Sequence, residues 1–559
     1  MVEPLWNSSS ISNDLPLAHA ASLEPVVAVA GLADRLLLNR VLQAGDARGS
    51  PNASNSHAQD PSQLDRFFGA ESVFDKLRLW LGDDFLRRHG KSTWREVALR
   101  LQQDISIIDG LLCQQSAKIL HHPQFLQLEA GWRGLLHLTE CKERASEAPI
   151  RIRVLNANWA ELRRDFDKAS EFDQSQLFQL VYDNEFGMPG GTPFGALLAD
   201  YDVTPRPSDI AIVKSLSQVA AAAFCPVFLN TSPSMFGVDR FDQMQHSIDY
   251  SKVQSDLDFL SWRQFRETED SRFVGLVMPR MLMRRPYGEE KVARSGYLFE
   301  EQDTDRNSHV WGGAVYAVGE TLIRAFSQSR WLADIRGIQR GVDGGGLVLG
   351  PVSLDFSTDS REIASKPITD LVISDALERK LADLGFISLC ACKDAPFAGF
   401  FSSPSAQKPK RFNTDDANAN AKMSAMLNYM LCVSRFSHFI KIIGRDKIGS
   451  FTEPELLQRE LHNWLMEYVV SNPDASLSIK ASRPLRAAPR YKFRGCGFAQ
   501  CSLGRELALN NSLFFQKLGY RRARLFSILE NLGAQARLNG ALGIAWHIVK
   551  EQDIFGANA

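Results

Sequence analysis

A change of hydrophobic period recurs along most of this 559-residue chain, and it restricts the fold more than any other feature of the sequence. Residues 149–166, PIRIRVLNANWAELRRDF, first alternate apolar and polar side chains and then place apolar residues three and four positions apart. Alternation is the period of a strand, and the longer spacing is the period of a helix. Related β-rich and helical runs follow at 209–232, 271–284, 369–393 and 421–449. We therefore expect an α/β body, with mixed sheets flanked by helices, over about residues 150–490.

Length and local composition divide the chain further. One hydrophobic core rarely organises so many residues, so several domains are expected. The stretch DARGSPNASNSHAQDPSQ at 46–63 predicts a mobile linker, and the helical spacing from Val73 to Leu138 predicts a helical hairpin. The expected parts are an N-terminal arm at 1–65, a helical hairpin region at 66–145, a first α/β domain at 146–375, a second domain at 376–488 and a basic, helix-like tail at 489–559.

Composition and charge exclude several classes of function. The 64 Lys and Arg residues balance 65 Asp and Glu residues to a net charge of −1, so no global attraction to nucleic acid or to an anionic membrane is expected. No apolar run approaches the roughly 20 residues of a spanning helix, and MVEPLWNSSS lacks the features of a secretion signal. Eight scattered cysteines without a CxxC pair are typical of reduced thiols. These features indicate a cytoplasmic protein that recognises its partners by shape.

Neither the glycine-rich stretches nor the histidines form a chemical motif. The stretches at 186–201 and 337–350 have neither a phosphate-loop Lys followed by Ser or Thr nor G-x-G-x-x-G between a strand and a helix, which favours turns and close backbone crossings. His121 and His122 are adjacent, so on a helix they point about 100° apart and cannot share one ion. We expect no catalytic, cofactor-binding or metal-binding residues, although a site assembled from distant residues leaves no such motif.

A dense charge cluster lies within SWRQFRETEDSRFVGLVMPRM at 261–281. Its members are Arg263, Arg266, Glu267, Glu269, Asp270 and Arg272. If the segment is helical, every acid has a basic neighbour three or four positions away. Paired carboxylates stay ionised and are poor proton shuttles at neutral pH, so ion pairing explains the cluster better than acid–base catalysis. The pairs either cover a solvated helix face or set the register between protein partners.

Seven stretches of the sequence, in a fixed order, point to one family. They are ILHHPQFLQLEAGWRGLLHL at 119–138, EFGMPGGTPFGALLADYDVTP at 185–205, VAAAAFCPVFLNTSPSMFGVDRF at 219–241, WRQFRETEDSRFVGLVMPRMLMRRPYG at 262–288, HVWGGAVYAVGETLIRAF at 309–326, the long run from CACKDAPFAGFF to GRDKIGSF at 390–451, and RPLRAA at 483–488. Together they resemble the large subunit of the type VI secretion contractile sheath, called TssC, VipB or ImpC. Seven ordered stretches are far more specific than one short motif.

The resemblance implies a structural protein that needs no cofactor and performs no enzymatic reaction. The family's large subunit forms a heterodimer with a small sheath subunit, TssB or VipA. These heterodimers stack helically with further copies around a tube of Hcp protein, on a baseplate, and contraction drives the tube into a target cell. A ClpV-type AAA+ unfoldase recycles the contracted form. The charges at 263–272 are then expected to hold subunit or domain packing, and neither nucleic acid nor membrane insertion is implied.

The N-terminal arm contains one helix candidate, GLADRLLLNRVLQAG at 31–45. Its apolar arc includes Leu32, Leu36, Val41 and Leu42. The resemblance implies that the unfoldase engages the large subunit near its N-terminus, which makes this helix the candidate recognition segment, presented to a groove by the linker. The alternative is that the helix packs against its own body.

The resemblance ends after Ala488. Family members continue with a strand, a Pro-Gly turn and a second strand bearing an LRPHF-like sequence, and these strands interlock neighbouring subunits, whereas this chain continues with PRYKFRGCGFAQ. Residues 489–559 hold ten Lys or Arg and four acids, a net charge of +6, with helix-like apolar runs. A shifted reading frame and a specialised paralogue with a helical tail both account for this. The alternative function is a non-polymerising paralogue that binds the small sheath subunit as a regulator or decoy.

Overall fold

The structure, a computed structural model, describes the chain in segments. These are residues 2–4, 63–81, 94–145, 147–244, 249–288, 299, 301, 309–338, 343–355, 365–393, 395–446, 454–470, 472 and 475–485. The expected helix at 31–45, the linker before Gln63 and the tail at 489–559 lie outside them. The chain divides into two compact units. The larger unit holds residues 1–6, 123–285 and 305–559, and the smaller holds 7–122 and 286–304.

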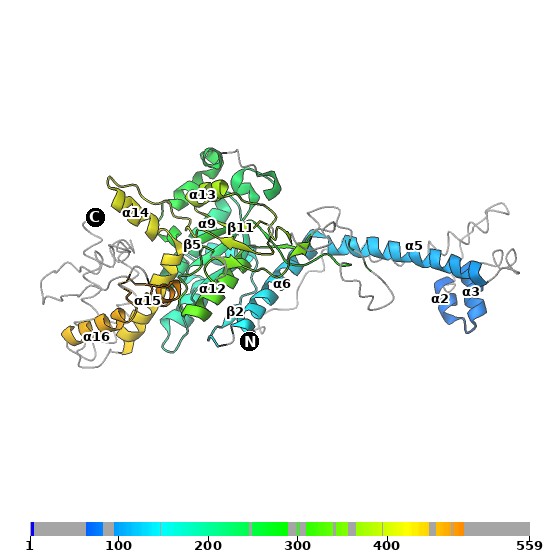
Figure 1. Ribbon diagram of the computed structural model, residues 1–559, viewed down its shortest axis with the longest axis horizontal. Helices are drawn as coiled ribbons and strands as arrows, with labels where there is room; N and C mark the ends of the chain where they lie inside the picture. Colours follow the sequence, from blue (N-terminus) through cyan, green and yellow to red (C-terminus); the bar gives the residue numbers. More distant parts are fainter. Residues whose placement is uncertain are drawn as a thin grey trace. The chain divides into compact units, whose positions relative to one another are not determined.

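A six-stranded mixed sheet forms the centre of the larger unit and confirms the expected α/β class (Figure 1). The strands follow the order β3 (Leu197–Val203), β4 (Val227–Thr231), β5 (Val274–Met278), β11 (Phe386–Ala391), β12 (Ala398–Phe400) and β8 (Leu347–Val348). The first four strands are parallel to one another, and β12 is antiparallel to both β11 and β8. Every residue of β4 and β5 is buried, as expected for parallel strands that are covered on both faces.

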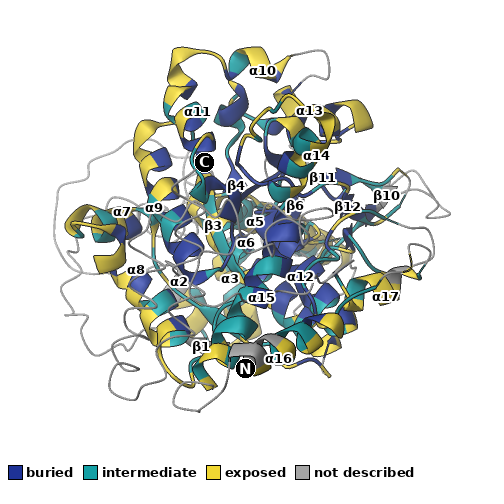
Figure 2. Cartoon of the chain, turned by 90° about the vertical axis from the view of Figure 1, so that its left-hand side faces the viewer, coloured by how far each residue is buried: buried dark blue, intermediate teal, exposed yellow. Residues whose placement is uncertain are grey.

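Helices cover the two faces of this sheet. Leu229 of β4 belongs to the hydrophobic core that contains α9 (Pro207–Ala223), whereas its neighbour Phe228 belongs to the core that contains α6 (Pro123–Arg144) and α12 (Val315–Ser329). Successive side chains of a strand point to opposite faces, so one apolar run supplies both cores. Buried residues gather where these strands and helices meet (Figure 2).

Local sequence explains how α9 begins, packs and ends. Pro207 occupies the first turn, where a helix needs no backbone N–H donor. The small residues Ala220–Ala223 are all buried, and small side chains permit a close approach. Phe224 then adopts a left-handed conformation, with φ at 50°, and the N–H of Cys225 donates to the carbonyl of Ala220 at 2.9 Å. This termination leads the chain directly into β4.

Shorter elements complete the larger unit. Three small pairs of strands accompany the main sheet: β1 (Val2–Pro4) with β2 (Ile152–Val154), β6 (Met281–Leu282) with β7 (Trp311–Gly312), and β9 (Leu354–Asp355) with β10 (Ser365–Lys366). The remaining helices are α7 (Trp159–Lys168), α8 (Gln176–Phe178), a π-helix (Gln179–Gly187), α10 (Tyr250–Val253), α11 (Leu260–Arg266), α13 (Asp375–Asp383), α14 (Asp415–Ser424), α15 (Leu427–Asp446), α16 (Pro454–Met466) and α17 (Leu477–Ser482), with short 3-10 turns between them.

Between Gln63 and Leu120, the described residues of the smaller unit are mostly helical. It contains α2 (Gln63–Gly69), α3 (Val73–Leu81) and α5 (Trp94–Leu120), of which α3 and α5 lie in the stretch where the sequence spacing predicts helices. The indole N–H of Trp80 donates to the Asp104 carboxylate at 3.0 Å, which joins α3 to α5. Among the described residues of the whole chain, no helix combines the length and the apolar character required to cross a membrane.

We expect acid to destabilise the protein through His438 on α15. The Nε2 atom of His438 lies 3.0 Å from the carbonyl oxygen of Ala223, to which it donates. Burial lowers the pKa of His438 to about 4, against the opposing effect of this hydrogen bond, and the nearby charges of Arg435 and Lys441 lower it further. The unfolded chain takes up the proton near pH 6.5 and the folded chain does not. The stabilising contribution of neutral His438 is therefore fully present above pH 6.5 and is lost as the pH falls towards 4.

The loss from this group between pH 7 and pH 5 is about 2 kcal/mol of unfolding free energy. Denaturant unfolding of the wild-type and His438→Gln chains at several pH values measures it, because glutamine keeps a donor but does not titrate. A steeper decline in the wild type supports the assignment. Identical declines in the two chains would contradict it.

Candidate functional site

The charge cluster at 263–272 joins several segments of the larger unit. The helix α11 ends at Arg266, and a turn leads to the 3-10 helix η8 (Asp270–Phe273), so the segment is not one continuous helix. Arg272 pairs with Glu269, and the Glu269 carboxylate also accepts from Lys410 Nζ at 2.8 Å. Glu267 is exposed, and Asp270 is half-buried at the start of η8. Glu269 and Arg272 are thus brought together across the predicted spacing of three residues.

Two arginines of the cluster bind main-chain carbonyls. Arg263 Nη1 donates to the carbonyl oxygens of Gln254 and Asp256, both at 2.8 Å. Arg266 is only 7% exposed, and its guanidinium donates to the carbonyls of Ala406 at 3.1 Å and Asp383 at 3.3 Å. Burial lowers the pKa of Arg266 to about 10, so its charge persists at neutral pH. The Arg266 side chain therefore connects α11 to the end of α13 and to the loop after β12.

Replacing Arg266 by methionine should lower the free energy of unfolding by about 2 kcal/mol, because the buried carbonyl of Ala406 and the partly buried carbonyl of Asp383 lose their donor. Chemical denaturation measures the change. The matched control is Arg240→Met, since Arg240 pairs with Asp242 at the surface and an exposed pair contributes less than about 1 kcal/mol. Equal losses for the two variants would show that the Arg266 contacts have no special importance.

A buried polar cluster lies between α6 and α12. Nε2 of His137 is 2.9 Å from Oε2 of Glu320 and 3.7 Å from Sγ of Cys141. All three residues are buried. Burial alone would lower the pKa of His137, but its hydrogen bonds to Cys141 and Glu320 outweigh that effect and raise the pKa to about 9. The same bond to His137 helps to lower the pKa of Glu320 despite the burial of its carboxyl group.

Backbone and side-chain donors surround the cluster. The N–H groups of Leu349 and Gly350 donate to the two oxygens of Glu320 at 2.8 and 3.2 Å. Nη2 of Arg144 donates to Sγ of Cys141 at 3.1 Å. Beside the cluster lies a cavity of about 530 Å³, lined by His137, Glu140, Glu143, Arg144, Gly350 and Pro351. The cluster thus has fixed donors on one side and accessible space on another.

A second polar network holds the start of α12 against the sheet. The buried Asn230 side chain of β4 accepts from the N–H of Val315 at 3.2 Å and donates to the Asp200 carboxylate at 2.7 Å. The Tyr316 hydroxyl donates to the other oxygen of Asp200 at 2.8 Å. These bonds fix the Tyr316 ring, which packs onto Gly134 of α6.

One face of α6 is apolar and exposed. Leu128, Trp132 and Leu136 are spaced four residues apart, and we call these three residues the α6 stripe. Their exposed fractions are 58%, 67% and 53%, whereas Ala130, Leu138 and Cys141 on the same helix are buried. The helix therefore has apolar side chains both in the core and at the surface. A row of large exposed apolar residues is typical of a protein–protein contact.

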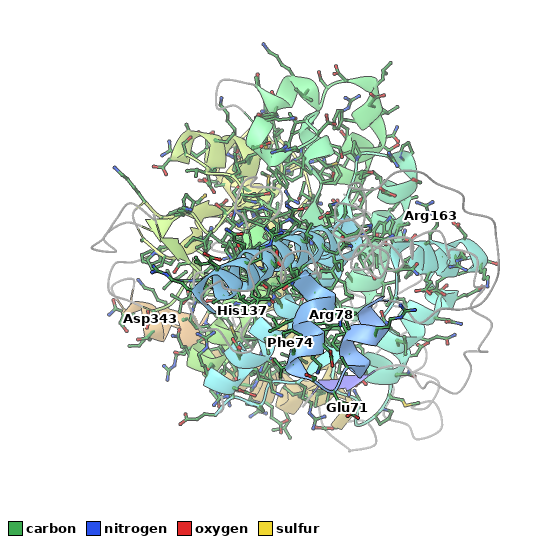
Figure 3. The ribbon with its side chains drawn as sticks, turned by 90° about the vertical axis from the view of Figure 1, so that its right-hand side faces the viewer. Glu71, Phe74, Arg78, His137, Arg163 and Asp343 are labelled. Atoms are coloured by element: carbon green, nitrogen blue, oxygen red, sulfur yellow. The ribbon has the colours of Figure 1, made fainter. Side chains whose placement is uncertain are left out.

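The smaller unit also exposes large apolar side chains. Phe68 of α2 and Val73 and Phe74 of α3 are largely exposed, and Figure 3 labels Phe74 on this part of the chain. Further exposed residues of α5 are Leu99, Ile105, Ile107, Leu112 and Ile119. In the same unit, His121 Nε2 binds Glu301 Oε1 at 2.8 Å. The candidate helix with Leu32, Leu36, Val41 and Leu42 lies outside the described residues.

Sequence reasoning did not identify the cluster of His137, Cys141 and Glu320. The spacing of His137 and Cys141, one helical turn apart, is a weak signal for two side chains on the same face. Glu320 is 183 residues from His137 in the chain, and no local pattern relates the two. Only the packing of α6 against α12 brings the three side chains together.

Comparisons with known proteins agree with the resemblance found in the sequence. Residues 102–407 match the VipB family, described as the EvpB/VC_A0108 tail sheath N-terminal domain. Residues 416–490 match its second part, the tail sheath gpW/gp25-like domain. The chain is also 36% identical over 393 residues to the type VI secretion system sheath protein TssC1 of Pseudomonas aeruginosa, an alignment that covers 69% of this chain and 78% of that protein.

Proposed function

Because the chain belongs to the VipB/TssC family of type VI secretion sheath proteins, we propose that it is a sheath large subunit that pairs with a small sheath subunit and polymerises with it around an inner tube. Contraction of the polymer then drives the tube, which the resemblance implies is Hcp. The polymer starts from a baseplate. A structural family of this kind requires no bond-making step from its subunits.

The observation that supports pairing is the α6 stripe. Its three large apolar side chains are exposed on a helix whose other face is anchored in the core. A partner that covers the stripe gains about 25 cal/mol for each Å² of apolar surface removed from water. The stripe is held on a rigid element, so little conformational entropy is lost when a partner binds.

We propose that the charge cluster at 263–272 transmits load within the subunit. Arg266 bridges α11, the end of α13 and the segment after β12, and Glu269 binds both Arg272 and Lys410. These contacts connect segments that are far apart in the sequence. During contraction the contacts between subunits rearrange while the core of each subunit does not. Each subunit therefore needs a rigid interior.

The N-terminal helix candidate at 31–45 is proposed as the recognition segment for a ClpV-type unfoldase. Its apolar arc of Leu32, Leu36, Val41 and Leu42 suits a hydrophobic groove. Deleting residues 31–45 should abolish unfoldase binding while leaving pairing with the small subunit intact. Retained unfoldase binding by the deleted chain would contradict the assignment.

A second candidate function is a non-polymerising paralogue that binds the small subunit as a regulator or decoy. It is favoured by one observation: the match to the second sheath domain ends at residue 490 and leaves 491–559 unmatched. If the strands that interlock neighbouring subunits are replaced there, pairing survives and polymerisation fails.

Co-expression with a small sheath subunit, followed by size-exclusion chromatography and electron microscopy, distinguishes the two functions. Tubular sheaths support the first proposal, and soluble heterodimers support the second. Replacing residues 489–559 by the corresponding C-terminal segment of TssC1 is the matched control, because it should convert heterodimers to tubes if only the tail prevents assembly. A chain that binds no small subunit contradicts both functions.

A further inference from the structure

The buried cluster between α6 and α12 has the composition and geometry of a metal site. His137 and Cys141 lie one turn apart on α6, and Glu320 projects from α12. The possible ligand atoms of these three residues all lie within 4.8 Å of one another. We propose that His137 Nε2, Cys141 Sγ and a carboxylate oxygen of Glu320 bind one zinc-class divalent cation, which clamps α6 to α12.

The distances are close to those that a tetrahedral ion requires. Zinc binds thiolate sulfur at about 2.3 Å and imidazole nitrogen or carboxylate oxygen at about 2.0 to 2.2 Å, which separates neighbouring ligand atoms by roughly 3.3 to 3.8 Å. Sγ of Cys141 and Nε2 of His137 are 3.7 Å apart, within this range. Nε2 and the Glu320 oxygen are 2.9 Å apart and separate by a few tenths of an ångström when a cation replaces the proton between them. The third pair, Cys141 Sγ and a Glu320 carboxylate oxygen, lies within 4.8 Å.

The kinds of ligand select the kind of ion. One thiolate, one imidazole and one carboxylate suit zinc and cobalt(II), whereas magnesium and calcium prefer oxygen ligands alone. The charges also balance, because the thiolate and the carboxylate together neutralise a divalent cation. Nε2 of His137 lies 2.9 Å from the Glu320 carboxylate, and the buried Nδ1 of His137 has no hydrogen-bond partner among the described residues. Nε2 is therefore the ring nitrogen that faces the other two ligands.

Surrounding groups hold the ligands in place. The N–H groups of Leu349 and Gly350 orient the Glu320 carboxylate, as outer hydrogen bonds commonly do for metal ligands. Nη2 of Arg144 donates to the Cys141 sulfur at 3.1 Å and so fixes the position of this ligand atom. These contacts are already formed before any ion binds, so the site is organised in advance.

The adjacent cavity supplies the fourth position and a route of entry. It has a volume of about 530 Å³ and is lined by His137 itself, so it reaches one of the three ligand residues. Glu140 and Glu143 also line it, and their carboxylates attract cations. A site with three protein ligands commonly retains water at the fourth position. The cation is therefore expected to exchange with solvent rather than to be sealed in.

Cobalt(II) titration of the purified full-length chain tests the site directly. We expect a thiolate-to-cobalt charge-transfer band and visible absorption bands as intense as those of tetrahedral cobalt(II). These bands should saturate at one ion per chain and disappear when zinc is added. Absence of the thiolate band at saturating cobalt overturns the proposal. This readout uses the wild-type chain, so it does not depend on the folding of any variant.

Variants then assign the ligands. Cys141→Ser should remove the band and weaken zinc binding at least about 100-fold, and Glu320→Gln should weaken it at least about 10-fold. The matched control is Cys392→Ser, which changes a half-buried cysteine outside the cluster and should bind zinc as the wild type does. Zinc should raise the melting temperature of the wild type and of Cys392→Ser. A band and a zinc affinity that survive in Cys141→Ser overturn the proposal, as does their loss in Cys392→Ser.

Discussion

Trp132→Glu should weaken binding of the small sheath subunit at least about 100-fold, the largest effect on assembly that we expect from a single surface substitution. Trp132 is the central residue of the α6 stripe and is 67% exposed. Large aromatic residues near the centre of an interface contribute most of its binding energy. A carboxylate at this position loses its water in the complex without gaining a partner, which adds a desolvation penalty to the lost contact area.

Because the Trp132 side chain projects from the surface, the isolated chain should keep its melting temperature. Affinity capture of the co-expressed small subunit, followed by titration of the purified chains, measures the effect on pairing. The matched control is Leu257→Glu, which introduces the same carboxylate at an apolar residue that is 83% exposed and lies outside the stripe. Unchanged affinity in Trp132→Glu, or an equal loss in Leu257→Glu, would exclude the α6 stripe as the pairing surface.

Gly134→Leu should lower the free energy of unfolding by about 3 kcal/mol or more, the largest loss of stability predicted here. A Cβ atom at Gly134 would lie 2.4 to 2.5 Å from three atoms of the Tyr316 ring. The ring cannot move aside easily, because its hydroxyl donates to Asp200 at 2.8 Å. Gly319 on α12 is equally restricted, since a Cβ there would lie 2.5 Å from the Leu138 side chain. The two helices are thus closer than larger residues permit.

Calorimetry of the wild type and the variant measures this loss. The matched control is Gly110→Leu on α5, because no atom lies within 4 Å of a Cβ at that position. Replacing a glycine at an open helix position stabilises the helix by up to about 1 kcal/mol. The two substitutions should therefore change the free energy of unfolding in opposite directions. A stabilising Gly134→Leu would show that α6 and α12 separate without cost. Such a result would also argue against a rigid metal clamp between them.

Helix α6 contributes residues to both the proposed pairing surface and the proposed metal site. One face of α6 supplies the exposed stripe, and the opposite side supplies His137 and Cys141 beside α12. A cation that ties α6 to α12 would therefore hold the pairing surface rigidly against the sheet. Pairing and metal binding nevertheless have separate tests, because Trp132 is not a ligand and Cys141 is not exposed.

Much of the fold was evident in the sequence because the relevant patterns are local. The alternation in PIRIRV and the helical spacing in NWAELRRDF correspond to β2 and α7, and Asn158 with Glu161 forms the capping box that begins α7. The apolar runs VFLNT and VGLVM became the buried strands β4 and β5. The family resemblance was also readable, since ordered stretches of sequence carry it without any knowledge of contacts.

The long-range interactions of polar side chains were decided by the tertiary structure alone. The sequence placed Arg266 among acids within a possible helix, yet α11 ends at Arg266, whose guanidinium binds the carbonyl of Ala406, 140 residues away. Likewise, nothing near His137 indicates Glu320, which meets it only because α6 packs on α12. Hydrophobic periodicity indicates which face of a helix or strand is buried, because the residues of one face recur at a fixed spacing along the chain. Which polar groups meet inside the protein depends on how distant segments pack, and a local pattern carries no record of that.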